Sequence, residues 1–317
     1  SYNYAQRLIS YISRINYAYK DKYLASVSFR RDGYSAFGPE SKYGDFPAAS
    51  IGWIASNEDF LKDSSVISNL KFRFSYGVTG NPFFNVGDVL VNNFPYLSLL
   101  QSSTAVVDGS SATGFNPINI ANSSLQWERS IEVNPGIDFS LFSNRISGSV
   151  EYYERTTDDL FQSVPISLLN GQSVIQANSG SLENRGFDLQ LSYNVIQPAK
   201  PGDLSLTLNV VGNYNTNEIL EVPTEDGSRD IGTNQILREG GVIGEWYMAR
   251  YAGVNPANGN LLFFDINGDL TENPTTEDRI RTGLNVTPEY QGSFGFDLDY
   301  KNFFLTTQFK PLFSLFK

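Results

Sequence analysis

Two residue types are missing from this chain, and each absence excludes chemistry. The 317 residues contain no cysteine, which excludes disulfides, thiolate metal sites and nucleophilic cysteine catalysis. They contain no histidine, so neither a Ser-His-Asp triad nor an ordinary zinc site is available. No apolar run reaches about 18 residues, the length that a transmembrane helix needs. The chain opens on Ser1 without a basic, apolar leader, so we expect a mature or internal piece of a longer protein.

Positive charge is also scarce, which limits the kinds of partner that the chain can bind. The net charge is −11, whereas a nucleic-acid partner calls for a basic surface, so we expect no nucleic acid. Aromatic residues, by contrast, reach 14%, with 18 Tyr and 23 Phe. This abundance favours β-structure or a protein rich in interfaces over an ordinary globular enzyme.

Alternation of apolar and polar residues with period two dominates the chain. In "FDLQLSYNV", Phe187, Leu189 and Leu191 alternate with Asp188 and Gln190, as expected for a strand with two unlike faces. Helix-like periodicity is almost absent; one short exception is predicted at 57–65. About ten strands are predicted, at 7–20, 22–32, 46–56, 68–80, 125–140, 145–160, 178–196, 203–218, 288–300 and 303–310. Pro135 lacks the backbone N–H that would donate a hydrogen bond to the neighbouring strand, so we expect a bulge or bend there.

The connections between these strands alternate strictly between short and long. The short ones are predicted at 20–22, 57–67, 141–144, 196–202 and 301–302, and the long ones at 33–45, 81–124, 161–177 and 219–287. A meander with this pattern has all its long loops at one end. An outer-membrane barrel has that asymmetry, with short periplasmic turns and longer extracellular loops, whereas a soluble sandwich has no reason for it.

Aromatic residues gather beside the short turns. They include Tyr17, Tyr19, Tyr23, Phe139, Phe142, Tyr300, Phe303 and Phe304. Rings at these places predict an aromatic girdle at a membrane interface. The polar face is mainly Ser, Asn, Thr, Asp and Gln, which suits a water-filled lumen better than a protein exterior. We therefore expect the apolar face to contact lipid; the alternative is a soluble extracellular β-sandwich that binds glycans without transport.

Several stretches, in a fixed order, resemble the SusC/RagA type of TonB-linked outer-membrane transporter. They are "NYAYKDKYLASVSFRRDGYSAFG", "FPAASIGW", "NEDFL", "ISNLKFRFSYGVTGN", "LQWERS", "GIDFSLFSNRISGSVEYYERTTDDL", "GSLENRGFDLQLSY" and "RYAGVNPANGNLLFFDINGD". The resemblance covers nearly the whole chain. It implies an all-β fold, a transmembrane antiparallel barrel of about 22 strands with a plug domain, of which about ten strands are present here.

The resemblance also implies partners, a location and limits. Such a barrel lies in the outer membrane of a Gram-negative bacterium and imports oligosaccharides or peptides, powered by the TonB complex through the plug, with a SusD-like lipoprotein over its mouth. We expect residues 1–317 to be a segment of the barrel domain, with the plug and the final strands outside it. A ten-stranded piece has two open edges, which leave backbone groups unpaired in lipid.

Candidate sites are few, and no catalytic residue or cofactor is expected. Asp265, Asn267 and Asp269 resemble the start of a calcium loop, but an Asn-Gly turn explains them better, since the glycine and glutamate positions of that loop do not match. Asp297 and Asp299 share one polar strand face, so a lumen lining explains them without hydrolysis. Ligand-binding residues stay unassigned, although six loop aromatics could stack on sugars or pack the loops: Phe83, Phe84, Phe94, Tyr96, Trp246 and Tyr247.

Overall fold

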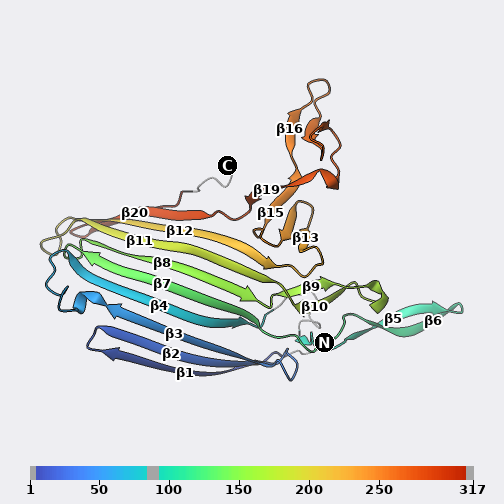
Figure 1. Ribbon diagram of the computed structural model, residues 1–317, viewed down its shortest axis with the longest axis horizontal. Coiled ribbons are helices and arrows are strands. Elements are labelled where there is room, and N and C mark those ends of the chain that lie inside the picture. Colours follow the sequence, from blue (N-terminus) through green and yellow to red (C-terminus); the bar gives the residue numbers. More distant parts are fainter. Residues whose placement is uncertain (1–4, 84–92, 312–317) are drawn as a thin grey trace.

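Ten long strands pair side by side into one antiparallel sheet (Figure 1). The computed structural model describes residues 5–83 and 93–311. The sheet confirms the ten strands that period-two alternation predicts, and its spatial order follows the chain. The strands are β1 (Leu8–Tyr19), β2 (Tyr23–Tyr34), β3 (Tyr43–Ile54), β4 (Ile67–Asn81), β7 (Glu128–Leu141), β8 (Ile146–Asp158), β11 (Ser181–Ile196), β12 (Ser205–Glu221), β20 (Tyr290–Tyr300) and β21 (Phe303–Phe309).

The long connections contain structure that the sequence pattern did not predict. Eleven of the 21 strands lie within them, as two hairpins, a four-stranded sheet and a three-stranded sheet. Together they make up the right-hand part of Figure 1. They are β5 (Leu100–Val107), β6 (Ser110–Pro117), β9 (Phe161–Pro165), β10 (Val174–Asn178), β13 (Ser228–Ile231), β14 (Gln235–Arg238), β15 (Glu245–Ala249), β16 (Tyr251–Val254), β17 (Leu261–Phe264), β18 (Leu270–Thr271) and β19 (Arg279–Asn285). We call this end of the main sheet the loop end, and the opposite end the turn end.

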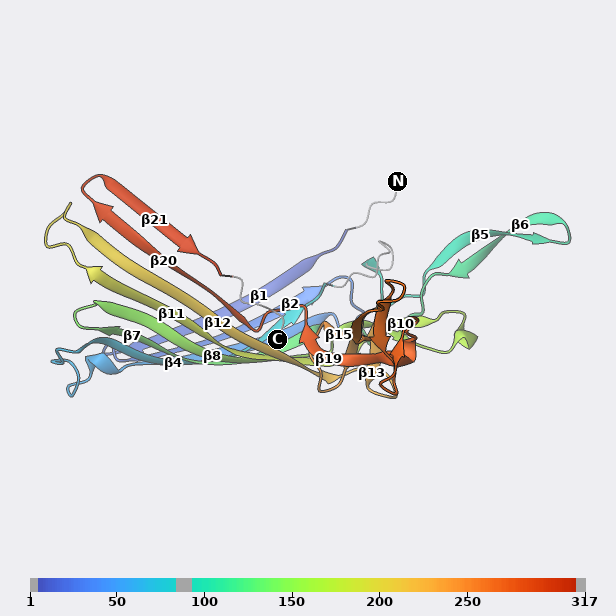
Figure 2. The same cartoon turned by 90° about the horizontal axis from the view of Figure 1, so that it is seen from above.

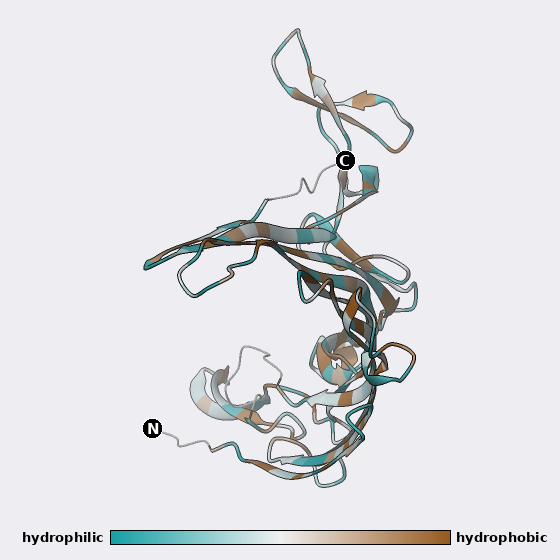
Figure 3. Cartoon of the chain, turned by 90° about the vertical axis from the view of Figure 1, so that its left-hand side faces the viewer, coloured by the Kyte–Doolittle hydropathy of each residue, from teal (hydrophilic) through white to brown (hydrophobic). Residues whose placement is uncertain are grey.

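The main sheet is curved, and its apolar face is the convex one. Figure 3 shows the sheet as an open arc. On β3 the apolar Ile51 is 63% exposed, whereas the polar Ser50 beside it is half-buried. Side chains spread apart on a convex face and crowd on a concave one, so this contrast assigns the apolar residues to the outside. No second sheet covers that face in residues 5–83 and 93–311, so the alternative of a soluble sandwich is wrong.

The register gives each face a single character across neighbouring strands. Leu189 of β11 stands opposite Val150 of β8, and Asp188 opposite Glu151. Because side chains alternate along every strand, a one-residue slip would exchange the two faces. In the part of the chain that the structure describes, no helix is long and apolar enough to cross a membrane.

Two local expectations, a helix at 57–65 and a bulge at Pro135, are wrong. The predicted helix at 57–65 is instead a single 3₁₀ turn, Ala55–Asn57, followed by an irregular turn around Glu58. At Pro135 the register with β4 and with β8 is the same on both sides, so no bulge forms. The proline lies in a stretch where the pairing of β7 with β8 skips from Val133 to Gly136, so its missing N–H costs the ladder little.

The buried core lies at the loop end, where β3 and β4 stop pairing beyond Ala48 and Gly77. Phe46 and Trp127 meet edge to face there, with ring centroids 5.4 Å apart. Trp127 donates from Nε1 to the Lys42 carbonyl. The full cluster consists of Tyr34, Ala36, Phe37, Phe46, Val78, Leu125 and Trp127. It therefore ties two of the long connections to the end of the sheet.

Candidate functional site

Charged side chains on the concave face of the sheet form the first candidate surface. Arg73 of β4 pairs with Glu151 of β8, and its Nε lies 3.1 Å from Asp138 Oδ1 of β7. Lys71 adds a contact of 3.7 Å to the second Asp138 oxygen. Asn134 donates from Nδ2 to Glu151. We call these five residues the wall cluster.

A row of amides and carboxylates continues from the wall cluster across the next strands. Asn213 of β12 donates to Asp188 of β11 over 2.6 Å. Asn209 donates to Asp297 of β20 over 2.6 Å, and Thr306 of β21 donates to the other Asp297 oxygen. Asp297 is therefore held by two hydrogen bonds as part of a polar wall, as its place on the polar face predicts.

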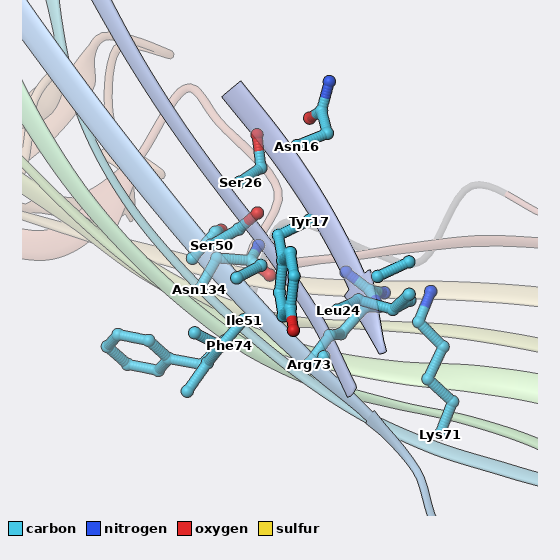
Figure 4. A pocket seen from close by; sticks show the side chains of 14 residues that line it. Asn16, Tyr17, Leu24, Ser26, Ser50, Ile51, Lys71, Arg73, Phe74 and Asn134 are labelled. Carbon is cyan, nitrogen blue, oxygen red and sulfur yellow. The ribbon is translucent and has the colours of Figure 1, made fainter. Parts of the chain in front are cut away.

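A cavity of about 430 Å³ lies beside the wall cluster. Asn16, Ser26 and Ser50 contribute polar side chains to it from β1, β2 and β3, and Arg73 and Asn134 line it from below (Figure 4). In the described residues, Asn134 Oδ1 is buried without a hydrogen-bond partner. The cavity thus offers amide, hydroxyl and guanidinium groups to a polar ligand, beside the apolar side chains of Leu24, Ile51 and Phe74.

Register decides which charges meet on this wall, so sequence reasoning missed the wall cluster. The alternation places Lys71 and Arg73 on a polar face, but it does not say which residue of another strand stands opposite. Glu151 and Glu154 lie three residues apart on β8 but on opposite faces of the sheet: Glu151 belongs to the wall cluster, whereas Glu154 accepts a hydrogen bond from Tyr152 on the convex face. Long-range pairing information would have been needed to find the cluster.

The long connections are bonded to one another at the loop end. Asn178 of β10 exchanges hydrogen bonds of 2.8 Å with the backbone of Gln126. Asn122 donates to the Gln176 carbonyl, and Arg229 of β13 donates to the Ser163 carbonyl of β9. Three connections, 81–128, 158–181 and 221–290, therefore form one bonded surface above the wall.

The loop aromatics do not gather into one platform. Phe83 packs edge to face on Tyr34, with centroids 5.9 Å apart. Phe94 is exposed, and Tyr96 is half-buried beside Gly38. Trp246 and Tyr247 are half-buried in β15, which belongs to a different sheet. Phe84 lies outside the described residues.

The four-stranded loop sheet contains a buried ion pair. The Glu245 side chain is 3% exposed, and Arg281 Nη2 lies 2.8 Å from its Oε2. Arg281 Nε donates to the same carboxylate, which raises the pKa of the guanidinium. The pair joins β15 to β19 and so holds this sheet together.

A carboxylate also organises the three-stranded sheet. Glu272 accepts hydrogen bonds from the side-chain amides of Asn260, Asn258 and Asn255, which lower the pKa of its carboxyl group. The side-chain oxygens of Asn255 and Asn258 accept hydrogen bonds from the backbone N–H groups of Ala257 and Asn260, which orients their amides. Glu272 therefore fixes the turn between β16 and β17.

The calcium candidates lie together in the turn after β17. Asp265 Oδ1 accepts the backbone N–H groups of Asn267 and Asp269, at 2.9 and 2.8 Å. These bonds form the Asn-Gly turn. The described residues contain no group of three or more acidic side chains that could hold a metal ion. Calcium binding stays the less favoured of the two interpretations of this stretch.

The hairpin β5–β6 stands apart from the rest of the loop surface. Figures 1 and 2 show it projecting away from the sheet. Phe115 is 70% exposed and Val106 is 76% exposed. Asp108 is its one charged residue, in a two-residue turn with Gly109 where both residues have positive φ. An isolated two-stranded hairpin is at best marginally stable, so a covering partner would stabilise it.

The sequence of this chain is similar to those of known β-barrel proteins. Residues 1–313 match the sequence model of the family described as TonB dependent receptor-like, beta-barrel. TonB-dependent receptor P39 of Formosa agariphila is 39% identical over 247 residues, which are 78% of this chain and 22% of that protein. TonB-dependent receptor SusC of Bacteroides thetaiotaomicron is 34% identical over 231 residues, 71% of this chain and 22% of SusC.

A solved structure agrees with these sequence matches. The RagAB peptide transporter superposes with a TM-score of 0.82 at 27% identity, over 96% of this chain and 33% of that one. The chain thus spans between about a fifth and a third of the length of the relatives it matches. It belongs to the TonB-dependent receptor β-barrel family of outer-membrane transporters and is similar to the SusC and RagA type.

Proposed function

We propose that this chain forms part of the barrel wall of a TonB-powered importer that takes up oligosaccharides or peptides. The concave polar wall carries this proposal, because a sheet that is apolar outside and polar inside suits a water-filled lumen in a membrane. The turn end is then periplasmic and the loop end extracellular. The plug and the TonB contact would belong to the whole receptor.

The chemistry of the wall favours polar ligands without strong negative charge. Carboxylates and amides such as Asp188 and Asn213 bond well to sugar hydroxyls and to peptide groups. The net charge of −11 repels polyanions. The similar RagAB complex is described as a peptide importer, which supports peptides as one of the two ligand classes.

A SusD-like or RagB-like lipoprotein is the partner we propose over the loop end. The similar structures are of a two-component complex, RagAB, recorded in closed-closed and open-open states. The bonded loop surface and the projecting β5–β6 hairpin present the area that such a lid would cover. The exposed side chains of Phe115 and Leu100 supply apolar contacts.

Uptake by the full-length receptor with its partner, in cells, tests the proposal. We expect one of two labelled probes, a neutral oligosaccharide mixture or a peptide mixture, to be imported. Ser50→Trp fills the wall cavity and should reduce uptake, whereas Ala49→Trp, on the same strand but on the convex face, should not. Import of a ferric siderophore with neither probe transported would overturn the proposal.

A further inference from the structure

A notch interrupts the convex, lipid-facing surface between β11, β12 and β20. It has a volume of about 580 Å³. Gly212 of β12 stands directly opposite Gly292 of β20, so two neighbouring positions on this face lack side chains. Phe187, Leu189 and Phe294 form its sides. Around it the face is filled by large apolar residues.

The backbone requires glycine at only one of these two positions. A Cβ on Gly292 would lie 2.7 Å from the Val211 carbonyl oxygen, which real contacts do not tolerate. A Cβ on Gly212 would meet nothing closer than Leu189 Cβ, at 4.0 Å, and Gly212 is not among the glycines with positive φ. A larger residue would therefore fit at 212, so the backbone conformation does not require the notch to be open there.

The polar end of the notch lies toward the loop end. The rings of Tyr214 and Tyr290 have centroids 4.8 Å apart and close this side. In the part of the chain that the structure describes, neither hydroxyl makes a hydrogen bond with the protein. One residue pair further on, Arg185 lies near Glu183 and Glu218, so the surface becomes charged.

The depth of the notch matches the outer leaflet. Tyr214 follows Ser205, the first residue of β12, by nine residues, or about 23 Å along the membrane normal for a tilted strand. The apolar band of such barrels is about 25 Å tall. The tyrosine pair therefore lies at the outer surface of the membrane, and the glycine pair just below it.

We propose that this notch holds one acyl chain of an outer-leaflet lipid, with the Tyr214 and Tyr290 hydroxyls bonded to its ester or headgroup oxygens. Neighbouring strands lie about 4.8 Å apart, so a notch across two paired glycines has the width of a single hydrocarbon chain. The change from apolar walls to hydroxyls to charges follows the polarity of a lipid from tail to headgroup. A second barrel docked here would present no such gradient.

Van der Waals packing, rather than removal of apolar surface from water, would hold the acyl chain in the notch. A lipid tail is equally apolar in the bilayer, so the gain comes from van der Waals contacts on three sides and from the tyrosine hydrogen bonds. We therefore expect an enrichment of a few-fold over the smooth surface. This inference depends on the barrel lying in the outer membrane and not on which substrate it imports.

Photo-crosslinking of the full-length receptor tests it. The probe is a phospholipid with a diazirine on its acyl chain, in vesicles of phosphatidylethanolamine and phosphatidylglycerol, and labelled peptides are read by mass spectrometry. We expect Leu189 and Phe294 to be labelled several-fold more than Val27, which is 60% exposed on the same face. Gly212→Leu should reduce that labelling to the level at Val27, and Ala49→Leu should leave it unchanged.

Two outcomes would overturn the inference. Equal labelling of notch and smooth face in the native receptor would mean that no lipid is held. Loss of a receptor dimer in Gly212→Leu, with lipid labelling unaffected, would assign the notch to a second copy. Gly212→Ala, which removes less space, serves as the second variant if Gly212→Leu fails to show the heat-dependent gel mobility of a folded barrel.

Discussion

Phe46 shows how single residues fix the loop end. Its ring occupies the space where a side chain on Gly80 would lie, and it is 7% exposed within the aromatic cluster. A Cβ on Gly80 would fall far inside contact distance of the ring. The absence of a side chain at Gly80 is what lets Phe46 reach Trp127.

Gly80→Ala should therefore loosen the loop end. Overpacking of this kind costs about 1–3 kcal/mol, which corresponds to roughly 5-fold to 140-fold faster amide exchange around residues 34–48. Hydrogen exchange of the full-length receptor in detergent measures it. Gly77→Ala is the control, because its Cβ would meet Ala48 Cβ at an ordinary 3.5 Å. Equal exchange in the two variants would contradict this role of Gly80.

Glu58 organises the longest turn at the turn end. Its carboxylate accepts hydrogen bonds from Lys22, Tyr23 and Trp53, and these lower its pKa from 4.5 to about 2. A carboxyl whose folded pKa is depressed stabilises the fold above its unfolded pKa, and loses that contribution as the pH falls. The pH window therefore runs from about 4.5 down to about 2.

The turn at 55–66 should open in acid because of Glu58. We expect Glu58→Gln to speed amide exchange in this turn at neutral pH, and the difference from the native receptor to shrink as the pH falls from 4.5 to about 2. Asp63→Asn is the control, since Asp63 makes no hydrogen bond with the rest of the described chain. A difference that does not depend on pH would refute the assignment.

At the scale of elements, strands and loops differ in how far sequence predicts them. Period two finds all ten strands of the main sheet, because each strand keeps one apolar and one polar face along its length. Most loop strands have five residues or fewer and take their partners from within irregular segments; β18, for example, has two residues. Their pairing depends on side chains such as Glu272 and Arg281, whose partners no local pattern reveals.

The hairpin β5–β6 should be removable without loss of the barrel. Ile118 N–H donates to the Leu99 carbonyl at its base, and Asn119 bonds both Leu97 and Leu99, so an Asn-Gly turn can replace residues 100–117. We expect the shortened full-length receptor to fold and to retain less of the proposed lipoprotein partner on co-purification. Phe115→Ser should weaken retention in the same direction. Full retention by both would exclude the hairpin from the partner interface.

At the scale of the whole molecule, the open sheet is part of a larger closed structure in the relatives. β1 and β21 are the edge strands of the described sheet, and unpaired backbone groups cost several kcal/mol each in lipid. Sequence alternation predicts this architecture, and the resemblance to SusC and RagA predicts its family. Neither sequence alternation nor the family resemblance predicts the wall cluster or the notch, because each depends on the register between strands that are distant in sequence.

The most direct test of the central claim is cysteine labelling along β11. These 317 residues contain no cysteine, so single substitutions at Phe187, Asp188, Leu189 and Gln190 can each be read separately once any cysteine elsewhere in the receptor is replaced by serine. In the full-length receptor in membranes, a water-soluble maleimide should label cysteines at positions 188 and 190. A thiol-reactive spin label dissolved in the lipid should instead label cysteines at 187 and 189. Uniform labelling, or the reverse alternation, would contradict a polar lumen and a lipid-facing apolar surface.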